Sequence, residues 1–460
     1  MKYLNYTLII SIISIIVSCN NTTNNKIVDK QGKELNINKI ISHNNIITDT
    51  TVSFSYFLPK EYNGKDDFPV IFFFDPHGNG NLPLNNYSTL ANKHKYIFIG
   101  INGIRNGQPV NYTYNIFTTV LSEVKNRFAI DKNRIFTAGF SGGAKLAMIF
   151  AQKVPDVIGV IACGASLTMS DNTKPDYYYV GIVGDKDFNY LEVQQTLVIY
   201  EKLNFDFTSI IFNGEHQWPL INSFDMALNG FDIYSIKTKK ISKNKELINN
   251  IWETMNDSIS TFNKREDMIQ ENIYINQTLR WFSGLKNTSL LQKRSYEIIH
   301  SKQFINYIKK HQKLITLEVK LRSEFIRAFN TKDIDWWEKE VQRINKSIKN
   351  TDKEISDVST RLKNYLSMVS FILIKKDLNI RKTDADVLKK MKIYKMVDPN
   401  NPDVYLMYSY YYMLLNDIVN MTHNFTDAKE KGFNDFETYK NDEFWSSLFN
   451  KKEIIKLREY

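Results

Sequence analysis

Cysteine and histidine are both scarce in this chain. Only two cysteines, Cys19 and Cys163, occur in 460 residues, and we expect no disulfide between them. Cys163 closes the apolar run 157–163, so the simplest prediction for it is a small buried hydrophobic residue. Only seven histidines are present, which leaves few side chains that could act as a general base near neutral pH.

A basic motif with interleaved aromatic residues is also missing. Such motifs mark proteins that bind nucleic acids, and the formal net charge of +10 is modest for this length. We therefore expect no nucleic-acid partner. The hydrophobic fraction of 43% and the aromatic fraction of 13% indicate a folded chain with a sizeable core. A length of 460 residues predicts two or three domains.

Long apolar runs are limited to residues 8–17, which are too few to span a bilayer as a stable anchor. Lys2 precedes this run, and Cys19 and an asparagine-rich stretch follow it. The segment resembles a bacterial lipoprotein signal, whose final cysteine is lipidated after cleavage. The resemblance implies removal of residues 1–18, a lipid on Cys19, a flexible tether over residues 19–45, and a location on the periplasmic face or surface of the cell envelope. A plain secretory signal is the alternative.

Apolar strand-like runs alternate with segments of helical periodicity between residues 46 and 236. Strands are expected at 51–58, 68–74, 96–100, 134–140, 157–163, 177–183 and 207–212, and helices at 113–127, 142–150 and 191–203. This alternation predicts an α/β fold, with a mostly parallel sheet covered by helices on both faces. Residues 31–50 are polar and give no clear assignment.

The most informative stretch surrounds Ser141. It contains Gly139, Ser141 and Gly143 in the pattern G-x-S-x-G, after a predicted strand and before a predicted helix. In this pattern the serine occupies a sharp strand-to-helix turn and exposes its hydroxyl above the end of a sheet. Small neighbours are needed because the chain doubles back on itself. Ser141 is therefore the predicted nucleophile.

A serine nucleophile needs a base, and the base needs an orienting carboxylate. His216 directly follows the last predicted strand of the sheet, so it is the expected base. Two carboxylates, Asp185 and Asp187, lie in the loop after residues 177–183. We favour Asp187 because its spacing from Gly184 places it farther beyond the strand end. The chain order Ser, Asp, His is the one that this kind of sheet requires.

An oxyanion hole would complete the site. The backbone N–H of Gly142 is the natural first donor, because it follows the nucleophile. The second donor is expected from the loop after residues 68–74, where we favour Asn79 over Gly80. His77, in the same loop, precedes the elbow in sequence and is expected to support the loop rather than act as the base.

Residues 46–236 resemble a secreted α/β-hydrolase of the esterase type, similar to polyhydroxybutyrate depolymerases and feruloyl esterases. The shared motifs are Asp75 to Gly78, Gly139 to Gly143, Asp187, and His216 to Pro219. The resemblance implies hydrolysis of a small-molecule or glycan-linked ester through an acyl-enzyme on Ser141, with no metal or other cofactor. A serine peptidase or amidase is the alternative, because acyl transfer to water uses the same parts.

The resemblance covers less than half of the chain. The disulfide cysteines of many secreted members are missing, and a long helical appendix follows. Helical periodicity and charge dominate from residue 237, so we expect a helical domain over 237–385 and a tetratricopeptide-like helical end over 386–460. These helices could hold a protein or glycan partner, in which case the protein would be a binding or scaffolding lipoprotein with a secondary hydrolase domain.

Overall fold

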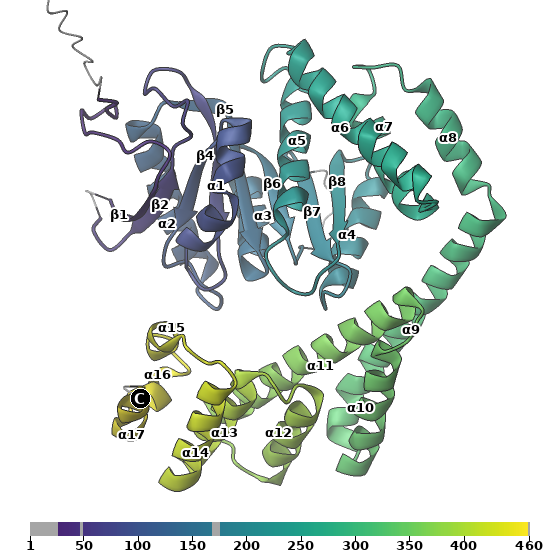
Figure 1. The fold of residues 1–460 in the computed structure, drawn as a ribbon. Helices are drawn as coiled ribbons and strands as arrows, with labels where there is room; N and C mark the ends of the chain where they lie inside the picture. The colour runs from purple at the N-terminus through teal and green to yellow at the C-terminus, as the bar shows by residue number, and fades with distance from the viewer. Residues whose placement is uncertain (1–25, 47–48, 168–174, 459–460) are drawn as a thin grey trace, which may run out of the picture.

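The computed structural model describes residues 26–46, 49–167 and 175–458. Cys19 and the signal segment lie outside these residues. Figure 1 shows a sheet with helices on both sides, from which the chain leaves through three helices and a long diagonal helix into a second group of helices. We name these parts the α/β domain (residues 26–237), the flanking helices (245–299) and the helical region (302–458).

The α/β domain is built on one eight-stranded sheet with the order β1-β2-β4-β3-β5-β6-β7-β8. Its strands are β1 (Ile40–Asn45), β2 (Ser53–Phe57), β3 (Phe68–Phe74), β4 (Ile97–Ile101), β5 (Ile130–Phe140), β6 (Val157–Cys163), β7 (Tyr178–Gly184) and β8 (Phe207–Phe212). β2 pairs antiparallel with both β1 and β4, and every pair from β4 to β8 is parallel. The expected α/β fold with a mostly parallel sheet is therefore confirmed.

Helices cover both faces of the sheet because its central strands are apolar on both sides. Along β3, Val70 and Phe72 enter the core on one face, and Ile71 and Phe73 enter the core on the other. The first core also contains α2 (Val110–Arg127), α3 (Gly142–Lys153) and α4 (Tyr190–Lys202), and the second contains α1 (Asn81–His94) and α5 (Ile221–Lys237). Cys163 is fully buried in β6, as predicted.

The expectation of a flexible tether up to residue 45 is wrong for its last part. Residues 40–45 form β1, which pairs with β2 at the edge of the sheet. Asp29 is buried and accepts a 2.9 Å hydrogen bond from Nε of Arg127 at the end of α2. No strand pattern is visible in this stretch, because β1 pairs on one side only and is half exposed, so few of its side chains are apolar.

The flanking helices pack against the α/β domain. They are α6 (Lys245–Lys264), α7 (Met268–Phe282) and α8 (Ser289–Ile299). Trp281 of α7 donates from Nε1 to Oγ1 of Thr208 in β8 at 2.9 Å, and Gln277 donates to the same oxygen at 3.1 Å. The helices after the predicted boundary at residue 236 thus cover the edge of the sheet that β8 leaves open.

The helical region has two connected cores. It contains α9 (Lys302–Thr331), α10 (Ile334–Ile348), α11 (Lys353–Asn379), α12 (Ala385–Val397), α13 (Pro402–Leu414), α14 (Ile418–Glu430), α15 (Phe436–Lys440), α16 (Ser446–Phe449) and α17 (Lys452–Arg458). Both α11 and α12 contribute buried residues to each core, so the predicted boundary between residues 385 and 386 does not separate two packed units. In the part of the chain that the structure describes, no helix is long and apolar enough to cross a membrane.

Candidate active site

Ser141 stands at the turn between β5 and α3, as the sequence pattern predicts. Its backbone has φ 53° and ψ −120°, a conformation that non-glycine residues rarely adopt. The turn is fixed by backbone hydrogen bonds. The Ser141 N–H donates to the carbonyl of Cys163 at 2.8 Å, and the Ser141 carbonyl accepts from Ala144 at 3.0 Å. The strained serine is therefore held from both the neighbouring strand and the following helix.

Three glycines make room for this turn. A Cβ atom on Gly139 would lie 2.1 Å from the carbonyl oxygen of Gly143, and one on Gly143 would lie 2.0 Å from the carbonyl oxygen of Phe74. A Cβ atom on Gly142 would lie 1.8 Å from Oδ1 of Asn106. All three distances are far below van der Waals contact. A side chain at Gly139 or Gly143 would meet backbone atoms and displace the turn, whereas one at Gly142 would displace the Asn106 side chain.

The structure brings Ser141, His216 and Asp187 into one hydrogen-bonded line. His216 Nε2 lies 3.0 Å from Ser141 Oγ, and His216 Nδ1 lies 3.0 and 2.9 Å from the two carboxylate oxygens of Asp187. The Asp187 side chain is 1% exposed, whereas that of His216 is 19% exposed. The carboxylate is thus enclosed, and the imidazole remains open on one side.

The geometry distinguishes the two candidate acids. Asp187 contacts His216 and also accepts from the N–H of Asn189 at 2.7 Å. Asp185 instead accepts from the N–H of Gly214 at 3.1 Å, in the loop that precedes His216. The favoured residue, Asp187, therefore lies against the imidazole, and Asp185 links the two loops that carry the acid and the histidine.

Aromatic rings enclose the imidazole. The ring centroids of Phe140 and Phe188 lie 4.6 and 4.2 Å from that of His216. Phe140 precedes Ser141, and Phe188 follows Asp187, so each neighbour of a site residue helps to fix the histidine.

Of the two oxyanion-loop candidates, Gly80 is already engaged, because its N–H donates to Oδ1 of Asn102 at 3.1 Å. The N–H of Asn79 makes only a long contact of 3.4 Å with Oδ1 of Asp75. Gly142 is the first residue of α3, where helical N–H groups have no partner within the helix. Asn106, which no sequence pattern identified, places its side-chain amide beside Gly142.

Comparison with known proteins gives only distant matches. No protein-family model matches the sequence, and no curated protein matches it. Among solved structures, S-formylglutathione hydrolase from Staphylococcus aureus is 14% identical and covers 43% of this chain and 97% of its own, with a TM-score of 0.35. A fluorophosphonate-binding serine hydrolase of the same organism is 14% identical over 42% of this chain and 98% of its own, with a TM-score of 0.36. A ferulic acid esterase is 16% identical over 41% of this chain and 93% of its own, with a TM-score of 0.32.

The architecture of the domain follows from its own geometry. The parallel strands β5, β7 and β8 end in the loops that carry Ser141, Asp187 and His216, in the chain order nucleophile, acid, histidine. The serine occupies a strained turn between a strand and a helix. The first domain has the α/β-hydrolase fold. We call it the hydrolase domain from here on.

The histidine loop of the hydrolase domain is held by Asp75, at the end of β3. Trp218 donates from Nε1 to Oδ2 of Asp75 at 3.0 Å, and Tyr87 donates to the carbonyl of Pro219 at 2.7 Å. Burial disfavours the Asp75 carboxylate, but the hydrogen bonds from His77 and Trp218 outweigh burial and lower the pKa of Asp75. The sequence places Asp75 and Trp218 in two separate motifs, and their hydrogen bond shows that these motifs meet in the folded protein.

The helical region contacts the acid loop directly. Three of its side chains donate hydrogen bonds to backbone carbonyls of this loop: Arg361 to Asp185 at 2.6 Å, Asn364 to Lys186 at 3.3 Å, and Arg322 to Phe188 at 2.8 Å. We name these three donors, Arg322, Arg361 and Asn364, the loop clamp. The loop that carries Asp187 is thus held by residues more than 130 positions away in sequence.

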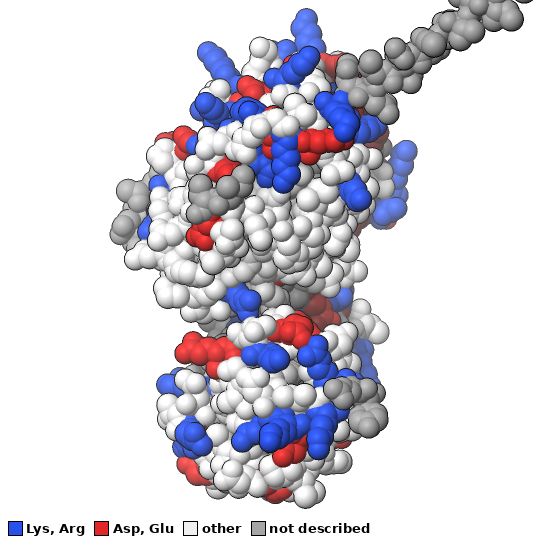
Figure 2. All heavy atoms as spheres, turned by 90° about the vertical axis from the view of Figure 1, so that its left-hand side faces the viewer, with Lys and Arg blue, Asp and Glu red and all other residues white. Residues whose placement is uncertain are grey.

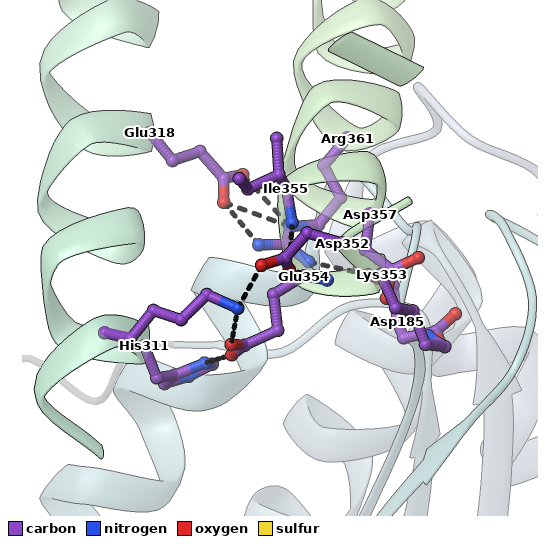
Figure 3. A network of polar contacts seen from close by, with 10 residues as sticks. Asp185, His311, Glu318, Asp352, Lys353, Glu354, Ile355, Asp357 and Arg361 are labelled. Carbon is purple, nitrogen blue, oxygen red and sulfur yellow. Dashed lines mark hydrogen bonds and ion pairs between the residues drawn. The ribbon is translucent and has the colours of Figure 1, made fainter. Parts of the chain in front are cut away.

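A buried carboxylate organises the loop clamp. Glu318 of α9 is fully buried and accepts hydrogen bonds from Arg361 at 2.6 Å and from Arg322 at 2.6 Å. Figure 3 shows Glu318 and Arg361 facing each other across α9 and α11, with Lys353 reaching toward Asp185. The Arg361 guanidinium also lies over the ring of Tyr190, 4.4 Å from its centroid. Two arginines around one carboxylate leave a net positive charge directed at the carbonyls of the acid loop.

Proposed function

We propose that this protein is a serine hydrolase that cleaves carboxylic esters through an acyl-enzyme on Ser141. The observation that carries the proposal is the hydrogen-bonded line from Ser141 Oγ through His216 to the buried Asp187. A serine hydroxyl is a weak nucleophile unless a base removes its proton, and a carboxylate behind the imidazole stabilises the imidazolium that forms.

In the first step, Ser141 Oγ attacks the acyl carbonyl while His216 Nε2 takes the hydroxyl proton. Asp187 holds Nδ1–H and fixes the tautomer of the ring. The imidazolium then donates its proton to the leaving alcohol, and the acyl-enzyme remains. In the second step, His216 takes a proton from water, and the resulting attack releases the acid and restores Ser141.

The negative charge that develops on the acyl oxygen is assigned to the N–H groups of Gly142 and Asn79. Each donor of this kind typically contributes about 10²–10³-fold in kcat, because it is already oriented when the charge appears. Gly80 is the poorer assignment, since its N–H already donates to Asn102.

Reaction with a fluorophosphonate probe tests the nucleophile. The folded wild-type protein should be labelled at Ser141, and Ser141→Ala should not be labelled. Absence of labelling on the folded wild-type protein would contradict every acyl-enzyme mechanism at this site. A panel of p-nitrophenyl esters, feruloyl esters and peptide amides then assigns the bond type, and hydrolysis of amides alone would replace the esterase by an amidase.

We further propose that the protein is tethered to the bacterial envelope by a lipid on Cys19. This part rests on the resemblance of residues 1–19 to a lipoprotein signal. Cys19→Ala should move the protein from the membrane fraction to the soluble fraction and abolish incorporation of labelled fatty acid. Membrane association of Cys19→Ala equal to that of the wild type would contradict the tether.

A further inference from the structure

A cavity joins the hydrolase domain to the helical region beside the catalytic histidine. Its volume is about 400 Å³, which lies within the range of small-molecule sites, about 300–1,000 Å³. Phe188, Glu215 and His216 line it from the hydrolase domain, and the remaining lining residues come from α11, α12 and the start of α13: Asn364, Ser367, Met368, Phe371, Tyr394, Asn401 and Asp403. Figure 2 shows that the molecule narrows between these two lobes.

The position of His216 determines which part of an ester this cavity can receive. His216 donates its proton to the oxygen of the departing alcohol, so that oxygen has to lie beside Nε2. The imidazole is part of the cavity wall. A second cavity, of about 660 Å³, is lined by Asn106, whose amide lies beside the oxyanion donor Gly142. The alcohol is thus expected on the His216 side, and the acyl group toward Asn106.

The lining of the His216 cavity combines aromatic faces with oxygen acceptors. Phe188, Phe371 and Tyr394 offer rings, and Glu215 and Asp403 offer carboxylates. Each carboxylate already accepts one hydrogen bond within the protein: Asn364 donates to Glu215 at 2.9 Å, and Tyr439 donates to Asp403 at 2.8 Å. Aromatic rings pack well against C–H groups, and carboxylate oxygens accept hydrogen bonds from O–H groups. A lining of both kinds therefore suits an alcohol that carries additional hydroxyl groups.

The lining residues include no lysine or arginine, so an anionic alcohol such as a phosphorylated one would find no counter-charge. A cationic alcohol is disfavoured for a different reason. Both lining carboxylates already accept hydrogen bonds, Glu215 from Asn364 and Asp403 from Tyr439. Burial also raises the pKa of Asp403, a shift that the hydrogen bond from Tyr439 and the nearby positive charges oppose only in part. The surroundings therefore favour a neutral group.

We propose that this cavity is the leaving-group subsite and that the helical region selects a compact, neutral alcohol with several hydroxyl groups, of about the size of glycerol or a monosaccharide. The inference rests on the proposed esterase function, because only an ester has such a leaving group. Asp403 and Tyr394 then bind the substrate, and the helical region is part of the active site rather than a separate binding module.

Three acetate esters test the subsite: 6-O-acetylglucose, n-hexyl acetate and acetylcholine, each followed by acetate release from the full chain. We expect kcat/KM for 6-O-acetylglucose to exceed that for each of the other two at least tenfold. Asp403→Asn keeps the shape of the side chain and should lower kcat/KM for acetylglucose at least tenfold more than for hexyl acetate. Asp335→Asn, an exposed aspartate of α10, is the matched control and should leave all three values unchanged.

A second variant tests the same wall of the His216 cavity without changing its charge. Ser367→Leu fills part of the cavity and should also lower the preference for acetylglucose over hexyl acetate. Three outcomes would each overturn the subsite. The wild type could hydrolyse hexyl acetate as well as or better than acetylglucose, it could prefer acetylcholine, or both variants could lose kcat/KM equally on all three esters. Fluorophosphonate labelling of Ser141 is measured in parallel. If labelling succeeds and the ester preference is absent, the subsite fails while the esterase function stands.

Discussion

The hydrolase domain and the helical region fix their functional residues in different ways. In the hydrolase domain, Ser141 is held by backbone hydrogen bonds from neighbouring elements and by glycines that permit close approach. In the helical region, the loop clamp acts through long charged side chains, oriented by the buried Glu318. Backbone hydrogen bonds within a sheet tolerate most side-chain changes, whereas a clamp made of three side chains depends on each of them.

The helical region lies against both the acid loop and His216. Its clamp holds the acid loop at the carbonyls of Asp185, Lys186 and Phe188, and its helices α11 to α13 line the cavity beside His216. The same loop therefore receives its acid from the hydrolase domain and its support from the helical region. Substitutions in the hydrolase domain and substitutions in the helical region can therefore be compared to separate these two contributions.

The largest effect is expected at the acid itself. Asp187→Asn keeps the size of the side chain but cannot stabilise the imidazolium, so kcat should fall on the order of 10⁴-fold. Asp185→Asn is the matched control, because Asp185 contacts Gly214 and not His216, and its kcat should stay within tenfold of the wild type. Ester hydrolysis measures both. An equal loss of kcat in the two variants would contradict the assignment of Asp187 as the acid and of Asp185 as a support for the loop.

The loop clamp comes next. Arg361→Met leaves the buried Glu318 with one of its two arginines and removes a donor to Asp185, and breaking a buried ion pair typically costs about 3–5 kcal/mol of unfolding free energy. We expect a loss in this range from chemical denaturation, together with lower kcat for the folded variant. The triple variant Arg322→Met, Glu318→Met and Arg361→Met should regain stability, because it leaves no buried charge of this group unpaired and apolar residues often replace buried ion pairs without loss.

The triple variant also separates stability from positioning. If the clamp positions the acid loop, kcat should remain low in the triple variant, because the contacts with the carbonyls of Asp185 and Phe188 are still missing. Full recovery of kcat together with stability would show that the two arginines act only on the fold.

A smaller effect is expected in the histidine loop. Trp218→Phe removes a hydrogen bond to a buried carboxylate, and leaving such a group without its donor typically costs about 1–3 kcal/mol. Because the folded-state pKa of Asp75 is lowered, the stabilisation is fully present above the unfolded value, about pH 3.9, and is lost as pH falls through the folded value. The difference in unfolding free energy between wild type and Trp218→Phe should therefore shrink below about pH 4.

Tyr87→Phe is the matched control for this pH dependence. It removes a hydrogen bond to the same loop, but the acceptor is the carbonyl of Pro219, which does not titrate. Its cost should be about 1 kcal/mol and should stay the same above and below about pH 4. A parallel decline in both variants would contradict the assignment to Asp75.

The smallest effect is expected at Lys353, which links α11 to Asp185 at 2.5 Å. Its side chain is 63% exposed, and exposed ion pairs contribute about 0–1 kcal/mol. Lys353→Met should therefore change the unfolding free energy by less than about 1 kcal/mol and leave kcat near that of the wild type. A loss as large as that of Arg361→Met would show that the exposed part of the network, and not the buried part, joins the lobes.

Much of the hydrolase domain could be predicted because its signals are local. The apolar runs of β3, β6 and β8 identified buried strands to within a residue, and Ser141 carried its own glycine pattern. β1 could not be found, since an edge strand needs few apolar residues. Glu318 and Arg361 look in sequence like ordinary charges on helical surfaces, and nothing in a single sequence links two residues 43 positions apart.

Strand periodicity and turn chemistry depend on neighbouring residues, so the sequence alone predicts all strands but β1, the elbow, and the order in which Ser141, Asp187 and His216 follow three strands. Tertiary packing places Asp187, and not Asp185, against His216, brings Asp75 to Trp218, and sets α9 and α11 against the loop that carries Asp187. These contacts depend on packing between distant segments, and their energies come from burial and distance in space rather than from spacing along the chain.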